Sequence, residues 1–149
     1  MKKISQKGRH VSMVDVSAKP VQRRTARATG RIELKNSTVS AIRDNRVGKG
    51  DVISAAQIAG IQAAKRTAEL IPLCHPIQIG KIEVALEVDE RGIKVTSEVV
   101  SVNRTGVEME ALTAVSVALL TVYDMCKAVD KTMKIGEITL LEKKKEDTR

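Results

Sequence analysis

The 149-residue sequence contains no tryptophan or phenylalanine and only one tyrosine, Tyr123. Its core must therefore be aliphatic, and the chain is long enough to bury such a core as one domain spanning residues 1–149. Proteins that bind single-stranded nucleic acid commonly stack bases on aromatic side chains. The near absence of these side chains argues against such a binding module.

Cysteine and long apolar runs are also scarce. Cys74 and Cys126 lie far apart and form no Cys-x-x-Cys pair, so neither a disulfide framework nor a structural zinc site is indicated. The first residues are polar after Met1, which does not suggest a signal peptide. No apolar run reaches the roughly 20 residues of a membrane span. We expect a cytoplasmic protein that does not interact with a membrane.

The formal net charge of +8 is concentrated near the N-terminus. Residues 1–35 contain ten Lys or Arg and two acids, whereas residues 36–149 balance. A segregated basic segment is typical of a protein with an anionic partner, such as nucleic acid, a membrane or a phosphorylated metabolite. A basic nucleic-acid-binding regulatory module is therefore one alternative. We expect residues 1–12 and 142–149 to be flexible tails.

Hydrophobic periodicity predicts strands alternating with helices. Apolar and polar residues alternate over residues 23–34, 82–88, 93–102 and 135–141, with a hairpin turn at residues 89–92. Helical patterns cover residues 36–43, 51–69 and 108–129, and Asn36 or Ser37, Asp51 and Thr105 are the expected caps. The pattern predicts an α+β protein of two layers, with an antiparallel sheet and its helices on one face.

The last predicted helix carries almost no charge on any side between residues 111 and 122. Burial on every side suggests packing between the sheet and a second subunit. Glu110 and Asp124 lie near its two ends, roughly 21 Å apart at about 1.5 Å per residue. They therefore serve different sites, or a neighbouring subunit completes one site.

Polar residues in unusual surroundings are candidates for chemistry. His75 lies between Pro72 and Pro76, in a segment that could equally be a connector with core side chains. Arg24 falls on the buried side of its strand, where it needs a protein carboxylate or a substrate phosphate unless the strand end frays. Lys49 is flanked by two glycines, which can present its ammonium to a ligand.

The two ends of the last helix carry further candidates. Asp124, Lys127 and Lys131 share one face, as reactive groups or as an ordinary salt-bridged turn. Glu108 and Glu110 flank Met109 at the other end, where acids also suit a helix N-terminus.

These residues belong to long blocks that resemble the cyclic pyranopterin monophosphate synthase family (MoaC family) of molybdenum cofactor biosynthesis. The resemblance covers nearly the whole chain. The blocks are Met13-Val14-Asp15-Val16-Ser17-Ala18-Lys19, Lys49-Gly50-Asp51-Val52, Ile58-Ala59-Gly60-Ile61-Gln62-Ala63-Ala64-Lys65-Arg66-Thr67, Leu70-Ile71-Pro72-Leu73-Cys74-His75-Pro76, Thr105-Gly106-Val107-Glu108-Met109-Glu110-Ala111-Leu112 and Tyr123-Asp124-Met125-Cys126-Lys127-Ala128-Val129.

The resemblance implies a ferredoxin-like fold, assembled as a hexamer (a trimer of dimers) with active sites at subunit interfaces. It implies a lyase that converts (8S)-3′,8-cyclo-7,8-dihydroguanosine 5′-triphosphate to cyclic pyranopterin monophosphate, with release of pyrophosphate. No resident cofactor or protein-bound metal is implied, although Mg²⁺ can accompany the triphosphate. An inactive homologue with the same fold is a further alternative.

The resemblance also implies site residues. Those matching catalytic positions are Asp124, Lys127, Lys49, His75, Glu110 and Glu108. Those matching substrate-contact segments are Leu73, Cys74, His75, Met109 and Glu110, and Arg24 matches a basic position. We expect Lys49 and Arg24 to face the phosphates, with Lys65 or Arg66 as an additional cation. We expect Asp124 and Lys127 to form an acid/base pair.

Two positions depart from the family pattern. Many members have His immediately before the Met13 block, whereas this chain has Ser12, with His10 two residues upstream. A Lys is common before Thr105, and this chain has Arg104. A proton-transfer role at position 104 is not expected, because a guanidinium does not titrate near neutral pH.

Overall fold

The computed structural model describes residues 10–148, in which four strands and four helices follow one another along the chain. The elements in order are β1 (Gln22–Glu33), α1 (Asn36–Arg43), α2 (Val52–Lys65), α3 (Thr67–Leu70), β2 (Lys81–Asp89), β3 (Gly92–Asn103), α4 (Glu108–Cys126) and β4 (Lys134–Asp147).

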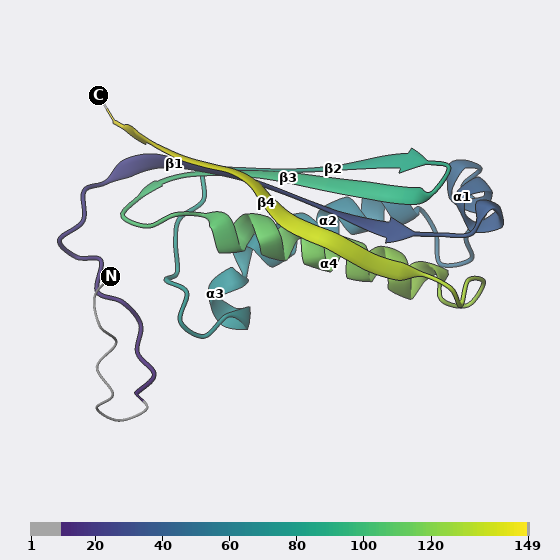
Figure 1. The fold of residues 1–149 in the computed structure, drawn as a ribbon, viewed down its shortest axis with the longest axis horizontal. Coiled ribbons are helices and arrows are strands. Elements are labelled where there is room, and N and C mark those ends of the chain that lie inside the picture. Colours follow the sequence, from purple (N-terminus) through teal and green to yellow (C-terminus); the bar gives the residue numbers. More distant parts are fainter. Residues whose placement is uncertain (1–9, 149) are drawn as a thin grey trace.

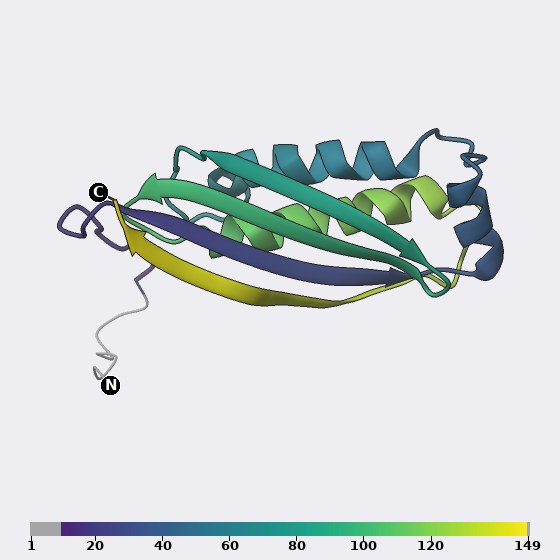
Figure 2. The same cartoon turned by 90° about the horizontal axis from the view of Figure 1, so that it is seen from above.

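The strands form one sheet with the order β2-β3-β1-β4, in which every neighbouring pair is antiparallel. Helices α2 and α4 lie side by side beneath this sheet, so the molecule has two layers (Figures 1 and 2). This architecture confirms the predicted α+β, ferredoxin-like fold with helices on one face.

Strand β1 has the two faces that its alternating sequence predicts. Ala26, Ala28 and Ile32 are fully buried and belong to the core cluster that includes α4. Arg27 lies on the opposite, open face, between Glu98 of β3 at 3.8 Å and Glu142 of β4 at 3.9 Å. The face without helices is therefore covered by paired charges instead of apolar side chains.

Helix α4 is the central core helix. By length and apolar composition it could cross a membrane, yet here it packs under the sheet, with nine buried residues of which seven belong to the hydrophobic core. Leu120 is 58% exposed and Tyr123 is also exposed on its outward side. No other element of residues 10–148 covers that side, so the packing of this face against a second subunit stays a prediction.

Several element ends differ from the predictions. The second helix breaks at Arg66 and does not run to residue 69, and α4 ends at Cys126. Of the predicted caps only Asp51 accepts a backbone hydrogen bond, from the Ser54 N–H at 3.1 Å. Helices α1 and α4 begin without a side-chain cap, after Lys35 and Val107.

Strand β4 is much longer than predicted. Residues 142–147, expected to form part of a tail, pair with the first half of β1. Their charges find partners on neighbouring strands, as Glu142 does with Arg27 and Glu146 with Arg23. A charged sequence can therefore be a regular strand here. Of the predicted N-terminal tail, residues 10–12 lie outside any helix or strand, and residues 1–9 lie outside the described part.

The buried carboxylate of Asp130 fixes the turn between α4 and β4. Its Oδ2 accepts hydrogen bonds from the Lys35 N–H at 2.8 Å and the Thr38 hydroxyl at 3.0 Å. Its Oδ1 accepts from the N–H and hydroxyl of Thr132, at 2.9 and 2.8 Å. Burial alone would raise the pKa of Asp130, but these hydrogen bonds outweigh it and lower the pKa to about 2.

We predict that Asp130→Asn lowers the free energy of unfolding at pH 7 by about 2 kcal/mol, because the amide nitrogen would face two donors. The folded pKa of Asp130 lies below the ordinary 3.8, so its stabilisation is complete above pH 4 and disappears as the pH falls through 2. Urea unfolding at pH 7, 4 and 3 should therefore show a shrinking difference between wild type and variant.

Asp44→Asn is the matched control, because Asp44 lies on the surface and pairs only with Arg46 among the described residues. A difference between wild type and Asp130→Asn that stays constant down to pH 3 would contradict the prediction.

Candidate active site

The segment of residues 70–76 delivers Cys74 and His75 to the start of α4. Helix α3 stops at Leu70, and Ile71 is extended at φ −111° and ψ 105°, as expected for a residue before proline. The Cys74 N–H then donates to the Ile71 carbonyl at 3.1 Å and closes a turn. The segment is thus a stiff connector whose His75 side chain faces a cavity.

This cavity, which we call the histidine cavity, measures about 270 Å³. Its walls come from three parts of the chain: residues 14–19, the connector, and the start of α4. The predicted substrate-contact residues Leu73, Cys74, His75, Met109 and Glu110 all line it, together with Glu108. The structure therefore brings together six of the predicted site residues, counting Glu108, at one end of the helix layer.

Glu110 is the buried acid of this cavity, with only 4% of its surface exposed. Burial raises its pKa, and the nearby charge of Glu108 raises it further. Burial and the charge of Glu110 also raise the pKa of the Cys74 thiol. A smaller cavity of about 130 Å³ adjoins the histidine cavity on the same side of the molecule. Glu110 and His75 line both cavities, and Lys65 and Arg66 line the smaller one.

His75 is held by one backbone contact. Its Nε2 lies 2.6 Å from the Val14 carbonyl oxygen. A carbonyl oxygen can only accept, so Nε2 carries the proton in this arrangement. With Nε2 engaged in this way, Nδ1 of the neutral imidazole is the ring nitrogen left as an acceptor.

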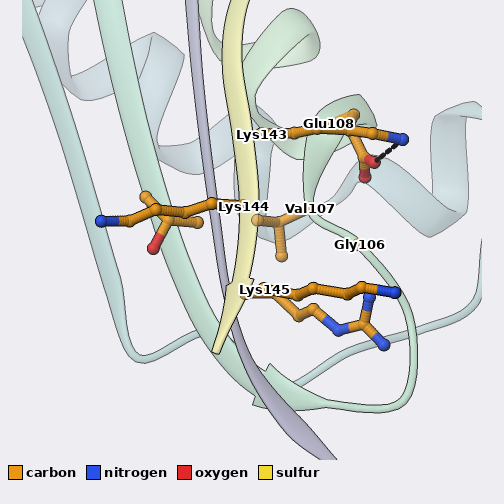
Figure 3. Close-up of a pocket in the computed structure, with 8 residues that line it drawn as sticks. Gly106, Val107, Glu108, Lys143, Lys144 and Lys145 are labelled. Atoms are coloured by element: carbon orange, nitrogen blue, oxygen red, sulfur yellow. Dashed lines mark ion pairs between the residues drawn. The ribbon is translucent and has the colours of Figure 1, made fainter. Parts of the chain in front are cut away.

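A second cavity of about 220 Å³, which we call the lysine cavity, lies beside the first. Figure 3 shows Lys143 and Lys145 extending from β4 toward one side, while Lys144 extends to the other. Glu108 pairs with Lys143 at 3.4 Å and lines both cavities. The Glu108 carboxylate is therefore part of the lining of both cavities.

Arg24 lines the lysine cavity together with Lys143, Lys144 and Lys145. Its Nη2 lies 3.5 Å from the Arg104 carbonyl, and its buried Nε has no hydrogen-bond partner. Within residues 10–148 it forms no ion pair, so no carboxylate of the described chain neutralises it. An unpaired guanidinium beside two lysines is suited to an anionic ligand.

Lys143 and Lys145 were not among the residues predicted from sequence. They stand opposite Ala26 and Arg24 in the β1–β4 register, so they share the inward side of the sheet with the buried residues of β1. The register shifts between Arg27 and Ala28, where Leu141 is the extra residue of β4, so the alternation before residue 141 does not continue beyond it and the sequence held no signal for these lysines.

Asp124, Lys49 and Lys127 form a third group, which we call the aspartate cluster. Lys49 Nζ donates to Asp124 Oδ2 and to its backbone carbonyl, both at 3.0 Å. Lys127 Nζ lies 3.0 Å from Asp124 Oδ1. The hydrogen bond from Lys49, followed by that from Lys127, lowers the pKa of Asp124. Gly50 at φ +116° makes the turn that delivers Lys49, which explains the glycine beside this lysine.

The aspartate cluster and the histidine cavity lie at opposite ends of α4. Asp124 belongs to its last turn and Glu110 to its first. Within one chain these residues cannot surround a single reacting atom, in agreement with the estimate from helix length. Lys131, predicted on the same face as Asp124, donates to the Lys127 carbonyl at 2.6 Å. His10 is exposed and lines none of the cavities described here.

Comparison with known proteins identifies relatives over most of the chain. A family model described as the MoaC family matches residues 13–146. The cyclic pyranopterin monophosphate synthase of Thermomicrobium roseum is 55% identical over 133 residues, which cover 88% of this chain and 80% of that protein. Cyclic pyranopterin monophosphate synthase 1 of Mycobacterium tuberculosis is 55% identical over 132 residues, covering 88% and 78%. The synthase of Listeria monocytogenes is 50% identical over 136 residues, covering 91% and 85%.

Proposed function

The chain belongs to the MoaC family, and we propose that it is a phosphorus–oxygen lyase acting early in molybdenum cofactor biosynthesis. It converts (8S)-3′,8-cyclo-7,8-dihydroguanosine 5′-triphosphate to cyclic pyranopterin monophosphate and pyrophosphate. The observation that carries this proposal is the adjacency of the histidine and lysine cavities, which share Glu108. The ring of the substrate, which undergoes proton transfers, can occupy the histidine cavity. Its triphosphate, which needs cations, can occupy the adjacent lysine cavity.

The histidine cavity supplies groups for the ring rearrangement. Opening a purine-derived ring and closing a pterin ring require several proton transfers. Glu110, whose pKa is raised by burial, can hold a proton closer to neutral pH than an exposed glutamate can. His75 provides a second titratable group on the same wall.

The lysine cavity supplies charge for the phosphate chemistry. Closing the cyclic phosphate breaks the bond between the α-phosphorus and the bridging oxygen of the leaving pyrophosphate. Cations that face this leaving group stabilise the charge that develops on it. Arg24, with its unpartnered Nε, and Lys143 are the cations that we assign to the phosphates, with Lys145 beside them. Lys65 and Arg66 line the adjoining cavity and can bind the remaining negative charge.

The aspartate cluster completes the site from another subunit in this proposal. Its Asp124–Lys127 pair acts as acid and base, and Lys49 keeps the aspartate ionised. The exposed Leu120 and Tyr123 on the outward side of α4 support an association of chains, since they leave an apolar helix face uncovered. We propose a hexamer made of three dimers, in which the histidine cavity of one chain faces the aspartate cluster of its partner.

The proposed enzyme works in the cytoplasm with a small nucleotide-derived substrate. We expect it to need no resident cofactor, while Mg²⁺ can accompany the triphosphate as part of the substrate. The identity to named synthases favours this reaction over the alternative of a basic nucleic-acid-binding module.

We predict that the wild-type protein supplied with the cyclised triphosphate releases pyrophosphate and yields a pterin that fluoresces after oxidation. Asp124→Asn should yield neither product above about 1% of the wild-type rate, because an amide cannot exchange protons as a carboxylate does. Asp44→Asn, an exposed aspartate paired with Arg46, is the matched control and should retain full activity. A folded wild-type oligomer that gives neither product would refute the proposed reaction.

We predict that Lys143→Ala raises the KM for the triphosphate about tenfold, because it removes a charged partner of the phosphates. Lys144→Ala is the control on the adjacent residue: Lys144 also lines the lysine cavity, but its side chain extends away from the other two (Figure 3). Inhibition by added pyrophosphate should weaken in parallel for Lys143→Ala alone. Equal effects of the two substitutions would mean that only the general charge of β4 matters.

We predict that two inactive variants restore each other when their subunits are exchanged. Asp124→Asn removes the aspartate cluster, and Glu110→Gln alters the histidine cavity. An equal mixture should contain about half mixed dimers. In each mixed dimer, one of the two sites combines the wild-type histidine cavity of one chain with the wild-type aspartate cluster of the other. The mixture should therefore recover about a quarter of the wild-type rate. The test is to unfold and refold the mixture together and compare it with each variant treated alone. No recovery from mixed oligomers would show that each chain builds its own site.

A further inference from the structure

Residues 14–19, which we call the strap, cross one side of the histidine cavity. The strap contains a turn in which the Lys19 N–H donates to the Val16 carbonyl at 3.0 Å, and the Ser17 N–H donates to Asp15 Oδ1 at 2.8 Å. It contributes Val14, Val16 and Lys19 to the cavity wall. Val14 remains 65% exposed, so apolar packing holds the strap only weakly.

Arg104 is the main polar anchor of the strap. Its Nη1 donates to the Ser17 carbonyl at 3.2 Å and to the Lys19 carbonyl at 2.5 Å. Both hydrogen bonds come from a charged donor, which makes them stronger than neutral ones. The contact of His75 with the Val14 carbonyl is the second attachment, and it lies at the other end of the strap.

The loop that carries Arg104 is itself well supported. The Thr105 N–H donates to Asn103 Oδ1 at 2.6 Å, and Asn103 Nδ2 donates to the Ser101 hydroxyl at 2.7 Å. The Arg104 carbonyl faces Arg24 Nη2 of the lysine cavity at 3.5 Å. Arg104 therefore belongs to a segment between β3 and α4 that is held by its own hydrogen bonds. This segment directly precedes the residues that line both cavities.

We propose that Arg104 is a positioning residue that holds the strap closed and thereby keeps Lys19 on the wall of the histidine cavity, where it faces the anionic substrate. This role rests on the proposed function. Arg104 lines none of the three cavities described here, so it acts through the strap. Both hydrogen bonds come from Nη1, whose two N–H directions are fixed by the planar guanidinium, whereas the rotating ammonium of a lysine is a less directional donor.

The strap's amides test the anchor without any turnover. Hydrogen exchange of the wild-type oligomer, followed by mass spectrometry, should show slow exchange for peptides that contain Ser17 and Lys19. In Arg104→Ala this exchange should accelerate at least tenfold, and in Arg104→Lys it should be intermediate. Arg91→Ala is the matched control: Arg91 is an exposed arginine of the β2–β3 hairpin that pairs with Glu33. Its substitution should leave strap exchange unchanged.

Kinetics test whether the anchor acts through Lys19. Arg104→Ala should raise the KM for the triphosphate about tenfold with a smaller change in kcat, because it weakens binding. Lys19→Ala should raise the KM as well. In the Lys19→Ala background, Arg104→Ala should raise the KM only slightly further. Arg104 is exposed and lies outside the core, so its variants should fold.

Two results would overturn the proposal: strap exchange that does not change in Arg104→Ala, or KM effects of the Arg104 and Lys19 substitutions that multiply in the double variant. A wild-type protein without turnover would refute the proposed reaction instead. In that case the exchange comparison would still decide whether Arg104 anchors the strap.

Discussion

The close packing of α4 against the sheet is the constraint on which the other features depend. Gly30 of β1 makes it possible, because a Cβ there would lie 2.8 Å from side-chain carbons of both Leu119 and Val115. With α4 fixed in this position, its first turn meets the connector that carries His75, and its last turn meets the loop that carries Lys49. One rigid helix thus sets the location of both groups of reactive residues.

The two ends of α4 offer different electrostatic environments. At the first turn, burial raises the pKa of Glu110 and favours its neutral form. At the last turn, two lysines on the surface lower the pKa of Asp124 and favour its charged form. Two carboxylates on one helix are therefore tuned in opposite directions by their surroundings. An interface between two chains could use both, because it would supply a carboxylic acid and a carboxylate together.

The fold was largely predictable because most strands alternate cleanly and the helices interrupt that alternation. The contact of Asp124 with Lys127 also agrees with the sequence-based expectation, whereas the contact of Lys49 with Asp124 was not predicted. Strand β4 was underestimated, since a run of lysines and acids gives no apolar alternation, and Lys143 and Lys145 were missed with it. The capping role of Thr105 was wrong because α4 begins at Glu108 after Val107, two residues beyond Thr105. The contacts of Arg104 join residues far apart in sequence, and no local pattern encodes them.

Strand β4 has one consequence beyond its contribution to the lysine cavity. It is the last strand of the sheet, and within residues 10–148 no further strand pairs with the outward backbone groups of its 14 residues. Such an edge is a template for the strand of another molecule, and charged side chains are a common protection against this pairing. Lys143 and Lys145 on one side and Lys144 on the other place positive charge on both faces of this edge. Residues suited to hold an anion also discourage aggregation, so their replacement by neutral residues would affect solubility as well as binding.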